Sequence, residues 1–173
     1  MDVRGKTILI TGAGRGLGAA MAKRLAARGA NLALVDLDAA GLGVVRDACR
    51  TLGVRAETYA ANVAAESDVI ATFDRVVADF GSLDGSIANA GILRDGLLVK
   101  AKDGEVTGKL SLEQWQAVID VNLTGVFLCG REAAERMICA GMPAAIFSRS
   151  SGFILATISV LMNPGAIALT RIS

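Results

Sequence analysis

The sequence contains no histidine, and its three cysteines show no CxxC spacing. Zinc sites are built mainly from closely spaced cysteine and histidine ligands. Cys49, Cys129 and Cys139 therefore favour buried, reduced thiols in a cytosolic protein over a zinc site. Aromatic residues make up only 4% of the chain, so the core must consist mainly of Ala, Val, Leu and Ile. That composition favours helices alternating with buried parallel strands over an aromatic-rich β-sandwich.

An excess of either charge is also missing, because 18 Lys and Arg residues nearly balance 17 Asp and Glu residues. Such a chain has no basic field to attract nucleic acid or an anionic membrane. The first apolar run, residues 6–11, is too short for a signal peptide. Residues 153–170 carry no charge over 18 positions, the lower limit for a membrane span. Asn163-Pro164 interrupts that stretch and no basic cluster flanks it, so a buried core or subunit-interface segment is favoured over a span.

The order of apolar patterns predicts an α/β fold in one domain, residues 1–173. Compact apolar runs alternate with segments of helical periodicity, several of which stop at glycine. This alternation is typical of a doubly wound parallel sheet with helices on both faces. The predicted strands are 6–11, 31–36, 55–63, 83–91 and 144–148, and the predicted helices are 16–28, 38–52, 65–80 and 112 to about 140.

Residues 94–109 break this alternation. Two short apolar runs flank "KDGE", and Asp-Gly is a strong hairpin signal. We therefore predict an exposed hairpin within an insert at 93–110, with a disordered loop as the alternative. Directly after it, Ser111 and Gln114 have the spacing of a capping box that begins the next helix.

The stretch "TGAGRGLG", residues 11–18, follows a predicted strand and opens a predicted helix. In that context, glycines let the backbone approach a pyrophosphate closely, and the helix N-terminus offers N–H groups to the anion. Asp36 stands at the end of the second strand, where a carboxylate can accept hydrogen bonds from ribose hydroxyls. Together these features predict a dinucleotide site, with a ligand-free glycine turn as the alternative.

The spacing of Gly12, Gly16 and Gly18 resembles the TGxxxGxG motif of the short-chain dehydrogenase/reductase family. "ANAG" at 88–91 is similar to the family's NNAG, and "VIDVNLTGVF" at 118–127 is similar to its long-helix segment. "ANV" at 61–63 lies where the family usually has Asp-Val beside the adenine. With "ILRDGLL" at 92–98, the chain looks most like 3-oxoacyl-(acyl-carrier-protein) reductases up to about residue 148.

This resemblance implies a Rossmann-like fold and a nicotinamide dinucleotide cofactor. We expect NAD, because Asp36 repels a 2′-phosphate; NADP is the alternative, because Arg15 can pair with that phosphate. The implied cofactor-binding residues are Gly12, Arg15, Gly16, Leu17, Gly18, Asp36, Leu37, Asn62, Val63, Asn89, Ala90 and Gly91.

The resemblance also implies catalytic positions. Asn122 matches the family's residue that helps hold a catalytic water, and Ser151 matches the Ser that orients the carbonyl, with a plain turn hydroxyl as its alternative. The family's proton-exchanging Tyr falls on Ser159, and the Lys that lowers its pKa falls on Asn163. Pro164 further disfavours helical geometry at Asn163.

Two functional hypotheses follow. The first is an NAD(P)-dependent oxidoreductase acting on a ketone or alcohol such as a 3-oxoacyl group, impaired by the loss of Tyr and Lys. The second is a non-catalytic dinucleotide-binding or subunit-interaction protein. The divergent tail, residues 149–173, fits a truncated relative, a degenerate one or a disrupted reading frame. We also expect a homo-oligomer, with Val126, Cys129 and Ala133 forming a small-residue seam on the long helix.

Overall fold

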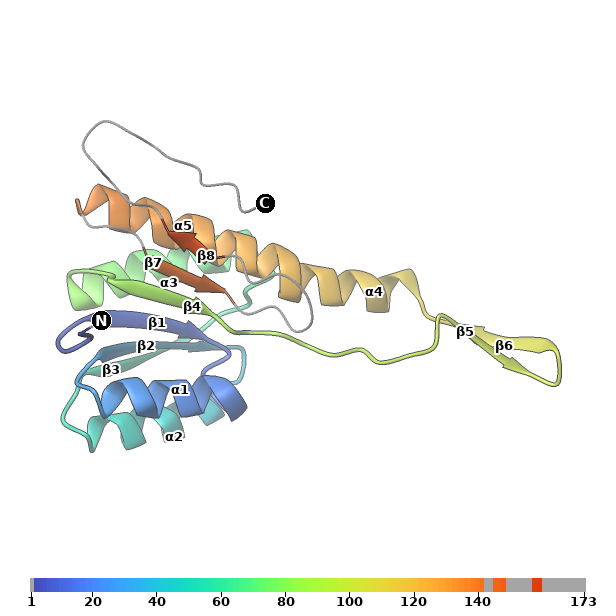
Figure 1. Ribbon diagram of the computed structural model, residues 1–173, viewed down its shortest axis with the longest axis horizontal. Coiled ribbons are helices and arrows are strands. Elements are labelled where there is room, and N and C mark those ends of the chain that lie inside the picture. Colours follow the sequence, from blue (N-terminus) through green and yellow to red (C-terminus); the bar gives the residue numbers. More distant parts are fainter. Residues whose placement is uncertain (1, 142–144, 149–156, 160–173) are drawn as a thin grey trace.

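The computed structural model describes residues 2–141, 145–148 and 157–159. Its main sheet has six strands in the order β3-β2-β1-β4-β7-β8 (Figure 1). The first five strands in this order are mutually parallel, and β8 pairs antiparallel with β7. The predicted parallel α/β sheet is confirmed, while the antiparallel strand β8 was not predicted. The strands are β1 Thr7–Thr11, β2 Asn31–Asp36, β3 Ala56–Ala60, β4 Gly85–Ala88, β7 Ala145–Ser148 and β8 Thr157–Ser159.

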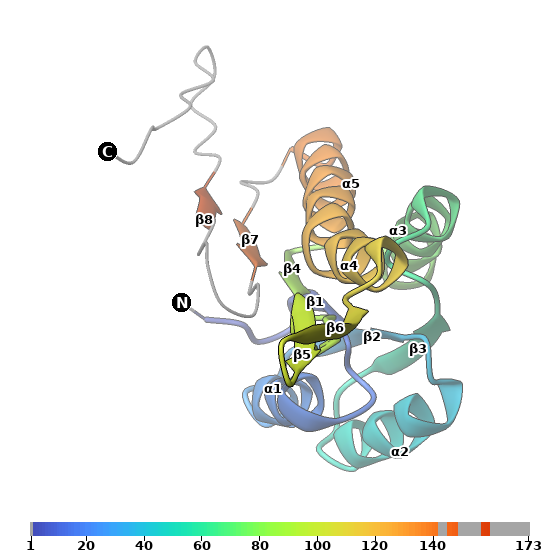
Figure 2. The same cartoon turned by 90° about the vertical axis from the view of Figure 1, so that its right-hand side faces the viewer.

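Helices cover both faces of this sheet (Figure 2). Helices α1, Gly16–Ala26, and α2, Ala39–Arg50, pack on one face, and α3, Glu66–Phe80, and α5, Gly125–Cys139, pack on the other. Alternate strand residues supply the two resulting cores, as expected for a sheet buried on both sides. The α1–α2 side holds Ile8, Ile10, Leu32, Leu34 and Leu42, and the α3–α5 side holds Leu9, Val35, Tyr59, Phe73 and Leu128.

The long helix predicted from 112 to about 140 is confirmed, with one irregularity. Helix α4, Leu112–Ile119, continues into α5 through a π-helical segment, η1, Asp120–Thr124. The predicted capping box is present, since Ser111 accepts from the Gln114 N–H at 3.1 Å and Gln114 accepts from the Ser111 N–H at 3.2 Å. Single π turns inside helices often mark functional positions.

The predicted hairpin is also confirmed. Strands β5, Val99–Lys102, and β6, Glu105–Lys109, pair antiparallel and extend far from the main sheet (Figure 1). Asp103 and Gly104 connect them with φ values of 51° and 84°. Positive φ at both central residues is the requirement of a type I′ turn, which explains the Asp-Gly signal.

The predicted oligomer seam on the long helix is wrong. Cys129 is 2% exposed and Ala133 is fully buried within the chain's own core, and Val126 packs against the same cluster. Their shared helix face points toward the sheet, so it is not available to a symmetry mate.

No helix among the described residues is long and apolar enough to cross a membrane.

Candidate functional site

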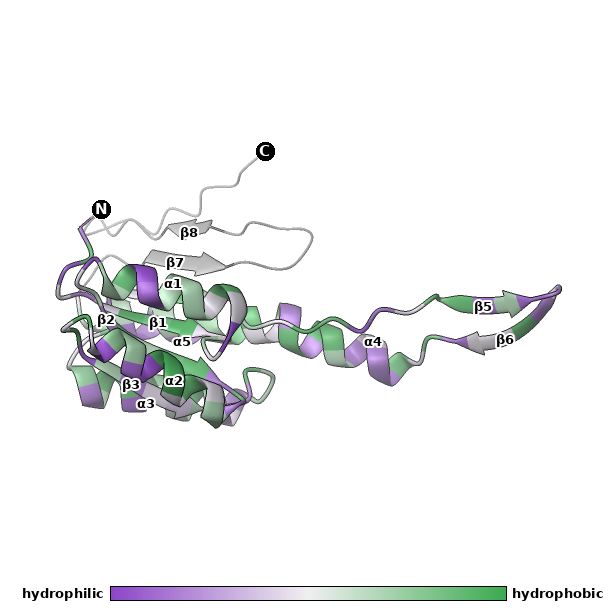
Figure 3. Cartoon of the chain, turned by 90° about the horizontal axis from the view of Figure 1, so that it is seen from below, coloured by the Kyte–Doolittle hydropathy of each residue, from purple (hydrophilic) through white to green (hydrophobic). Residues whose placement is uncertain are grey.

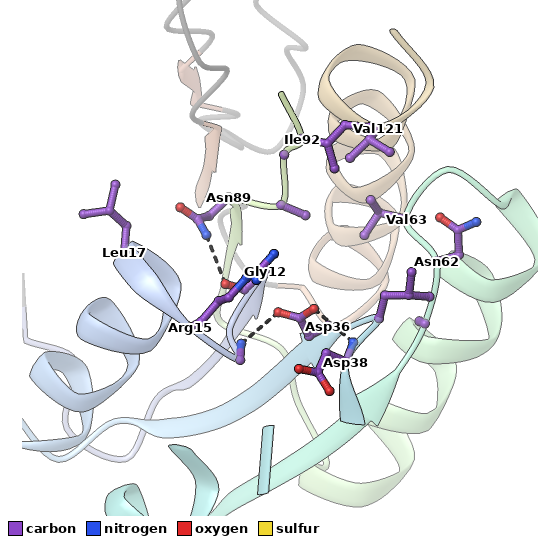
Figure 4. Close-up of a pocket in the computed structure, with 15 residues that line it drawn as sticks. Gly12, Arg15, Leu17, Asp36, Asp38, Asn62, Val63, Asn89, Ile92 and Val121 are labelled. Carbon is purple, nitrogen blue, oxygen red and sulfur yellow. Dashed lines mark hydrogen bonds between the residues drawn. The ribbon is translucent and has the colours of Figure 1, made fainter. Parts of the chain in front are cut away.

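A cavity of about 560 Å³ opens at the carboxyl ends of β1, β2 and β4. Strand β1 lies between β2 and β4, so the chain connections leave it in opposite directions at this point. Ligands of doubly wound sheets bind at such a switch point. The cavity is lined by Gly12, Gly14, Arg15, Leu17, Asp36, Leu37, Asp38, Ala61, Asn62, Val63, Asn89, Ala90, Gly91, Ile92 and Val121 (Figure 4).

Close backbone approach explains the glycines after β1. A Cβ at Gly12 would lie 2.9 Å from the Ala90 Cα, and Gly12 has a φ of 64°. A Cβ at Gly18 would overlap the Gly12 carbonyl oxygen. Gly16 also has positive φ, 55°, but open space lies where its Cβ would be. Gly12 and Gly18 therefore shape the turn, while Gly16 needs its positive φ; neither Gly16 nor Gly18 is among the residues that line the cavity.

The N-terminus of α1 faces this cavity as an uncapped helix end. Arg15 is the N-cap residue, its side chain makes no capping hydrogen bond, and the first turn contains no acidic residue. The first N–H groups of a helix have no intrahelical acceptor and carry partial positive charge. Arg15, which lines the cavity, adds a full positive charge. This end of the cavity is therefore suited to an anion.

Asp36, at the end of β2, lies beside the glycine turn, and two backbone N–H groups fix the orientation of its carboxylate. One oxygen accepts from the Gly14 N–H at 2.9 Å and the other accepts from the Asp38 N–H at 3.2 Å (Figure 4). A second acid, Asp38, also lines the cavity. Sequence reasoning missed Asp38, although an Asp directly before a helix is a typical N-cap, and its side chain accepts from Ala40 N–H at 3.0 Å.

Asn89 fastens the glycine turn to β4. Its side-chain Nδ2 donates to the carbonyl oxygens of Thr11 and Gly12 at 3.1 and 3.3 Å. In return, the Thr11 hydroxyl accepts from the N–H groups of Asn89 and Ala90, each at 3.0 Å. Thr11, which the sequence analysis did not single out, thus joins the two predicted stretches "TGAGRGLG" and "ANAG".

The segment after β3 forms another wall of the cavity. Asn62 Oδ1 accepts from the Ala64 N–H at 3.0 Å, and the Asn62 N–H donates to Asp68 at 3.1 Å. Val63 is buried and packs closely against Gly125 of α5. A Cβ added at Gly125 would lie 3.0 Å from the Val63 carbonyl oxygen, so a larger residue would crowd this contact. Leu37, 74% exposed, stands at the rim. All three predicted residues here, Leu37, Asn62 and Val63, line the cavity.

Asn122 lies in the π turn, but its side chain binds the backbone. Its Nδ2 donates to the Ile92 carbonyl at 2.9 Å, and its Oδ1 accepts from the Ile92 N–H at 2.8 Å. This pair holds the segment after β4 against the long helix. Asn122 is not among the residues lining the cavity, so its predicted role in holding water stays a prediction.

The remaining predicted catalytic positions lie at or beyond the edge of the described residues. Ser159 ends β8. Ser151, Asn163 and Pro164 lie outside the described residues.

The only tyrosine of the chain, Tyr59, is not in the cavity. It is 1% exposed and donates to the Asp79 carboxylate at 2.7 Å. Burial and this hydrogen bond raise the pKa of Tyr59 above the ordinary value for a tyrosine. Burial likewise raises the pKa of the Cys129 thiol to about 12. Neither group can therefore exchange a proton with a ligand in the cavity near neutral pH. Among the described residues, no group of three His, Cys, Asp or Glu could hold a metal ion.

The family model described as short chain dehydrogenase matches residues 6–170. The chain belongs to the short-chain dehydrogenase family. It is 38% identical over 151 residues to 3beta-hydroxysteroid dehydrogenase 1 of Eggerthella lenta, covering 87% of this chain and 54% of that protein. It is 37% identical over 161 residues to a 3-oxoacyl-(acyl-carrier-protein) reductase of Staphylococcus aureus, covering 92% of this chain and 59% of that protein.

Solved structures of short-chain dehydrogenases share the fold. NAD+-bound xylitol dehydrogenase has a TM-score of 0.73 at 32% identity, with 86% of this chain and 54% of that chain covered. Carveol dehydrogenase from Mycobacterium avium in complex with NAD has a TM-score of 0.76 at 28% identity, with 85% and 55% covered. The chain thus spans little more than half the length of the relatives it matches, and the expected incompleteness relative to the family is confirmed.

Proposed function

We propose that this short-chain dehydrogenase binds NAD in the cavity between the glycine turn and Asp36. The observation that carries the proposal is the uncapped α1 N-terminus beside Arg15, facing the same cavity as the oriented Asp36 carboxylate. A pyrophosphate fits the first feature and a ribose diol fits the second. A cavity of about 560 Å³ is also within the usual range for small-molecule sites.

Charge at the ribose end favours NAD over NADP. Asp36 and Asp38 both line the cavity there, whereas Arg15 is the one cation among the lining residues. Two anions within about 4 Å repel each other by on the order of several kcal/mol at reduced dielectric. The backbone N–H groups of Gly14 and Asp38 hold the Asp36 carboxylate in place, so it cannot simply turn away from a 2′-phosphate.

The proposed chemistry is hydride transfer between the nicotinamide and a small-molecule ketone or alcohol, such as a 3-oxoacyl group. The nicotinamide ring supplies or accepts the hydride when bound. The protein must then orient the carbonyl and exchange one proton with its oxygen. Ser151 is proposed to orient the carbonyl, and Asn122 is proposed to hold the water that completes the proton path. No Tyr or Lys stands at the positions where the family resemblance places them, Ser159 and Asn163.

We therefore propose that the chain binds cofactor but turns over slowly. Serine is too weak an acid to replace a phenol near neutral pH, and asparagine carries no charge to lower a neighbouring pKa. The second candidate function is a non-catalytic dinucleotide-binding or subunit-interaction protein. The exposed apolar side chains of the long helix favour association with further copies of the chain.

Titration with NADH followed by fluorescence tests cofactor binding. The variant Gly16→Val should abolish binding, because it fills the open space beside the cavity and strains a residue with positive φ. Gly53→Val is the matched control, since Gly53 also has positive φ and open space but lies away from the cavity. Equal NADH affinity in Gly16→Val and the unmodified chain would contradict the assignment. A 3-oxoester reduction assay on the same samples separates a slow enzyme from a non-catalytic protein.

A further inference from the structure

Residues 61–63 form the wall of the cofactor cavity next to Asp36. The Ala61 N–H donates to the Asp36 carbonyl oxygen at 3.1 Å. Asn62 and Val63 continue along the same side of the cavity (Figure 4). The proposed function places the adenosine ribose at Asp36, so the adenine attached to that ribose lies against this wall. What holds the wall in place therefore decides how well the proposed site fits the base.

Packing alone leaves part of this wall without close support. Val63 packs against Gly125 of α5. A second, small cavity of about 10 Å³ nevertheless lies on the α3–α5 side of the wall, and Ala61 and Val63 line it. Its other lining residues are Thr11, Val35, Val69, Thr72, Phe73 and Cys129. Atoms that border a void lack close contacts on that side, so the position of the wall depends on hydrogen bonds as well as on packing.

Three hydrogen bonds hold Asn62. Its side-chain Oδ1 accepts from the Ala64 N–H at 3.0 Å, and its carbonyl oxygen accepts from the Ala65 N–H at 3.0 Å. Its own N–H donates to the Asp68 carboxylate at 3.1 Å. The first two bonds are local turns within the loop. Only the bond to Asp68, among these three, ties the wall to helix α3.

Asp68 stands on a firm support, the first turn of α3. Hydrophilic and hydrophobic residues are interspersed along this helix (Figure 3). Its buried residues Val69 and Phe73 belong to the core on the α3–α5 side of the sheet. Glu66 and Asp68 are the acidic residues of the first turn, where the partial positive charge of a helix N-terminus stabilises a carboxylate. The carboxylate that binds Asn62 is thus carried by a helix anchored in the core.

Building on the proposed cofactor site, we propose that Asp68 is a positioning residue for its adenine end. Asp68 is not among the residues that line the cavity, so it acts through the Asn62 backbone and not through contact with the cofactor. Without this carboxylate the wall can shift toward the small cavity. The adenine then loses part of its contact with Asn62 and Val63.

Fluorescence titration with NADH tests the role of Asp68. Asp68→Ala should raise the Kd about threefold to tenfold, the effect expected when one exposed hydrogen bond to a charged group is lost. Asp68→Asn should bind NADH nearly as tightly as the unmodified chain, because its amide oxygen can still accept from the Asn62 N–H. Glu66→Ala is the matched control, since it removes a carboxylate from the same helical turn but one that pairs with Arg131. Its Kd should stay within about twofold of the unmodified value.

Two further measurements separate positioning of the wall from a general loss of structure. AMP carries the adenine and nicotinamide mononucleotide does not. Asp68→Ala should therefore weaken AMP binding as much as NADH binding and leave nicotinamide mononucleotide binding unchanged. Amide hydrogen exchange followed by NMR reports the hydrogen bond itself, and the Asn62 amide should exchange about tenfold faster in Asp68→Ala. The Ala13 amide, which donates to the Val35 carbonyl, should exchange at its original rate.

The possible outcomes keep this proposal separate from the proposed function. Equal NADH affinity in Asp68→Ala and the unmodified chain overturns the role of Asp68 and leaves the cofactor site intact. An equal loss in Glu66→Ala or Asp68→Asn, or an equal loss for nicotinamide mononucleotide, overturns it as well, because the effect then does not come from the bond to Asn62. An unmodified chain that binds neither NADH nor AMP refutes the cofactor site itself, and the positioning role falls with it.

Discussion

At the scale of single residues, the glycines near the proposed cofactor site have different physical roles. Gly12 and Gly18 allow the turn to close, whereas Gly16 has a positive φ and open space where a Cβ would lie. A fourth glycine, Gly41 in α2, comes from a different part of the sequence. A Cβ at Gly41 would lie 2.9 Å from the Gly14 carbonyl oxygen and 3.3 Å from the Asp38 carboxylate. Gly41 therefore positions the glycine turn, although it does not line the cavity itself.

Gly41→Ala should raise the Kd for NADH at least tenfold, because the added methyl group displaces Gly14 and with it the hydrogen bond to Asp36. Gly43→Ala in the same helix is the matched control, since nothing lies within 4 Å of its added Cβ. Replacing a helical Gly by Ala stabilises a helix by about 0.5–1 kcal/mol, so the control should melt slightly higher and bind NADH normally. Fluorescence titration and thermal melting measure both effects. If the two variants bind NADH equally, Gly41 has no positioning role.

At the scale of elements, α3 and α5 are joined by an ion-pair network around one buried carboxylate, Glu132. Glu132 is only 4% exposed and binds Arg131 at 2.8 Å and Arg136 at 2.7 Å. Arg136 continues to Asp74 of α3 at 2.7 Å, and Arg131 continues to Glu66 at 2.6 Å. A buried carboxylate depends on its partners, because desolvation without compensation is costly. The network fastens α5 to α3. Helix α5 continues directly from the π turn η1, whose Asn122 binds the backbone of Ile92.

Arg136→Met should destabilise the fold by about 3 kcal/mol, since it leaves Glu132 buried beside a single, half-exposed partner. Asp74→Asn should cost less than about 1 kcal/mol, because Asp74 is 66% exposed and solvent weakens its ion pair. Urea unfolding followed by circular dichroism compares the two. If both variants lowered the free energy of unfolding by a similar amount, the burial of Glu132 would not be the main contribution of this network to stability.

At the scale of the whole molecule, the proposed cofactor cavity lies in the well-described part of the chain, whereas the proposed catalytic positions lie near its end. The residues that line the cavity follow β1, β2, β3 and β4, except Val121 of the π turn η1. The family resemblance places the proton-exchanging Tyr on Ser159 and the Lys that lowers its pKa on Asn163. Ser159 ends a strand, β8, rather than lying within a helix.

Restoring Ser159→Tyr together with Asn163→Lys should therefore leave ketone reduction poor. Positioned acid–base groups typically contribute about 10² to 10⁴ in rate, but only when they meet at the carbonyl. Pro164 disfavours the helical geometry that would bring the two side chains together. Steady-state NADH oxidation with 3-oxoacyl and other ketone substrates measures the effect. Rapid ketone reduction by the unmodified chain would contradict the proposed slow turnover and would require another proton donor. A large gain in reduction rate in the double variant would show that residues 159–163 can adopt the helical geometry that brings the two side chains together.

The sequence by itself determined the features that depend on near neighbours. The glycine spacing predicted the turn, the apolar runs predicted the strands, and Asp103-Gly104 predicted the hairpin, because turn geometry and strand alternation are set within a few residues. Ser111 predicted the start of α4 for the same reason. Asp36 was predicted from its place at the end of β2, and it lines the cavity.

Only the tertiary structure decided which distant groups meet. Three contacts join segments that share no local sequence pattern. They are the hydrogen bonds between Asn122 and Ile92, the close approach of Gly41 to Gly14, and the antiparallel pairing of β8 with β7. The same holds for the face of α5 that is buried: helical spacing grouped Val126, Cys129 and Ala133 correctly but could not say what they contact. Periodicity defines the faces of a helix, whereas packing against the sheet selects which face loses its contact with water.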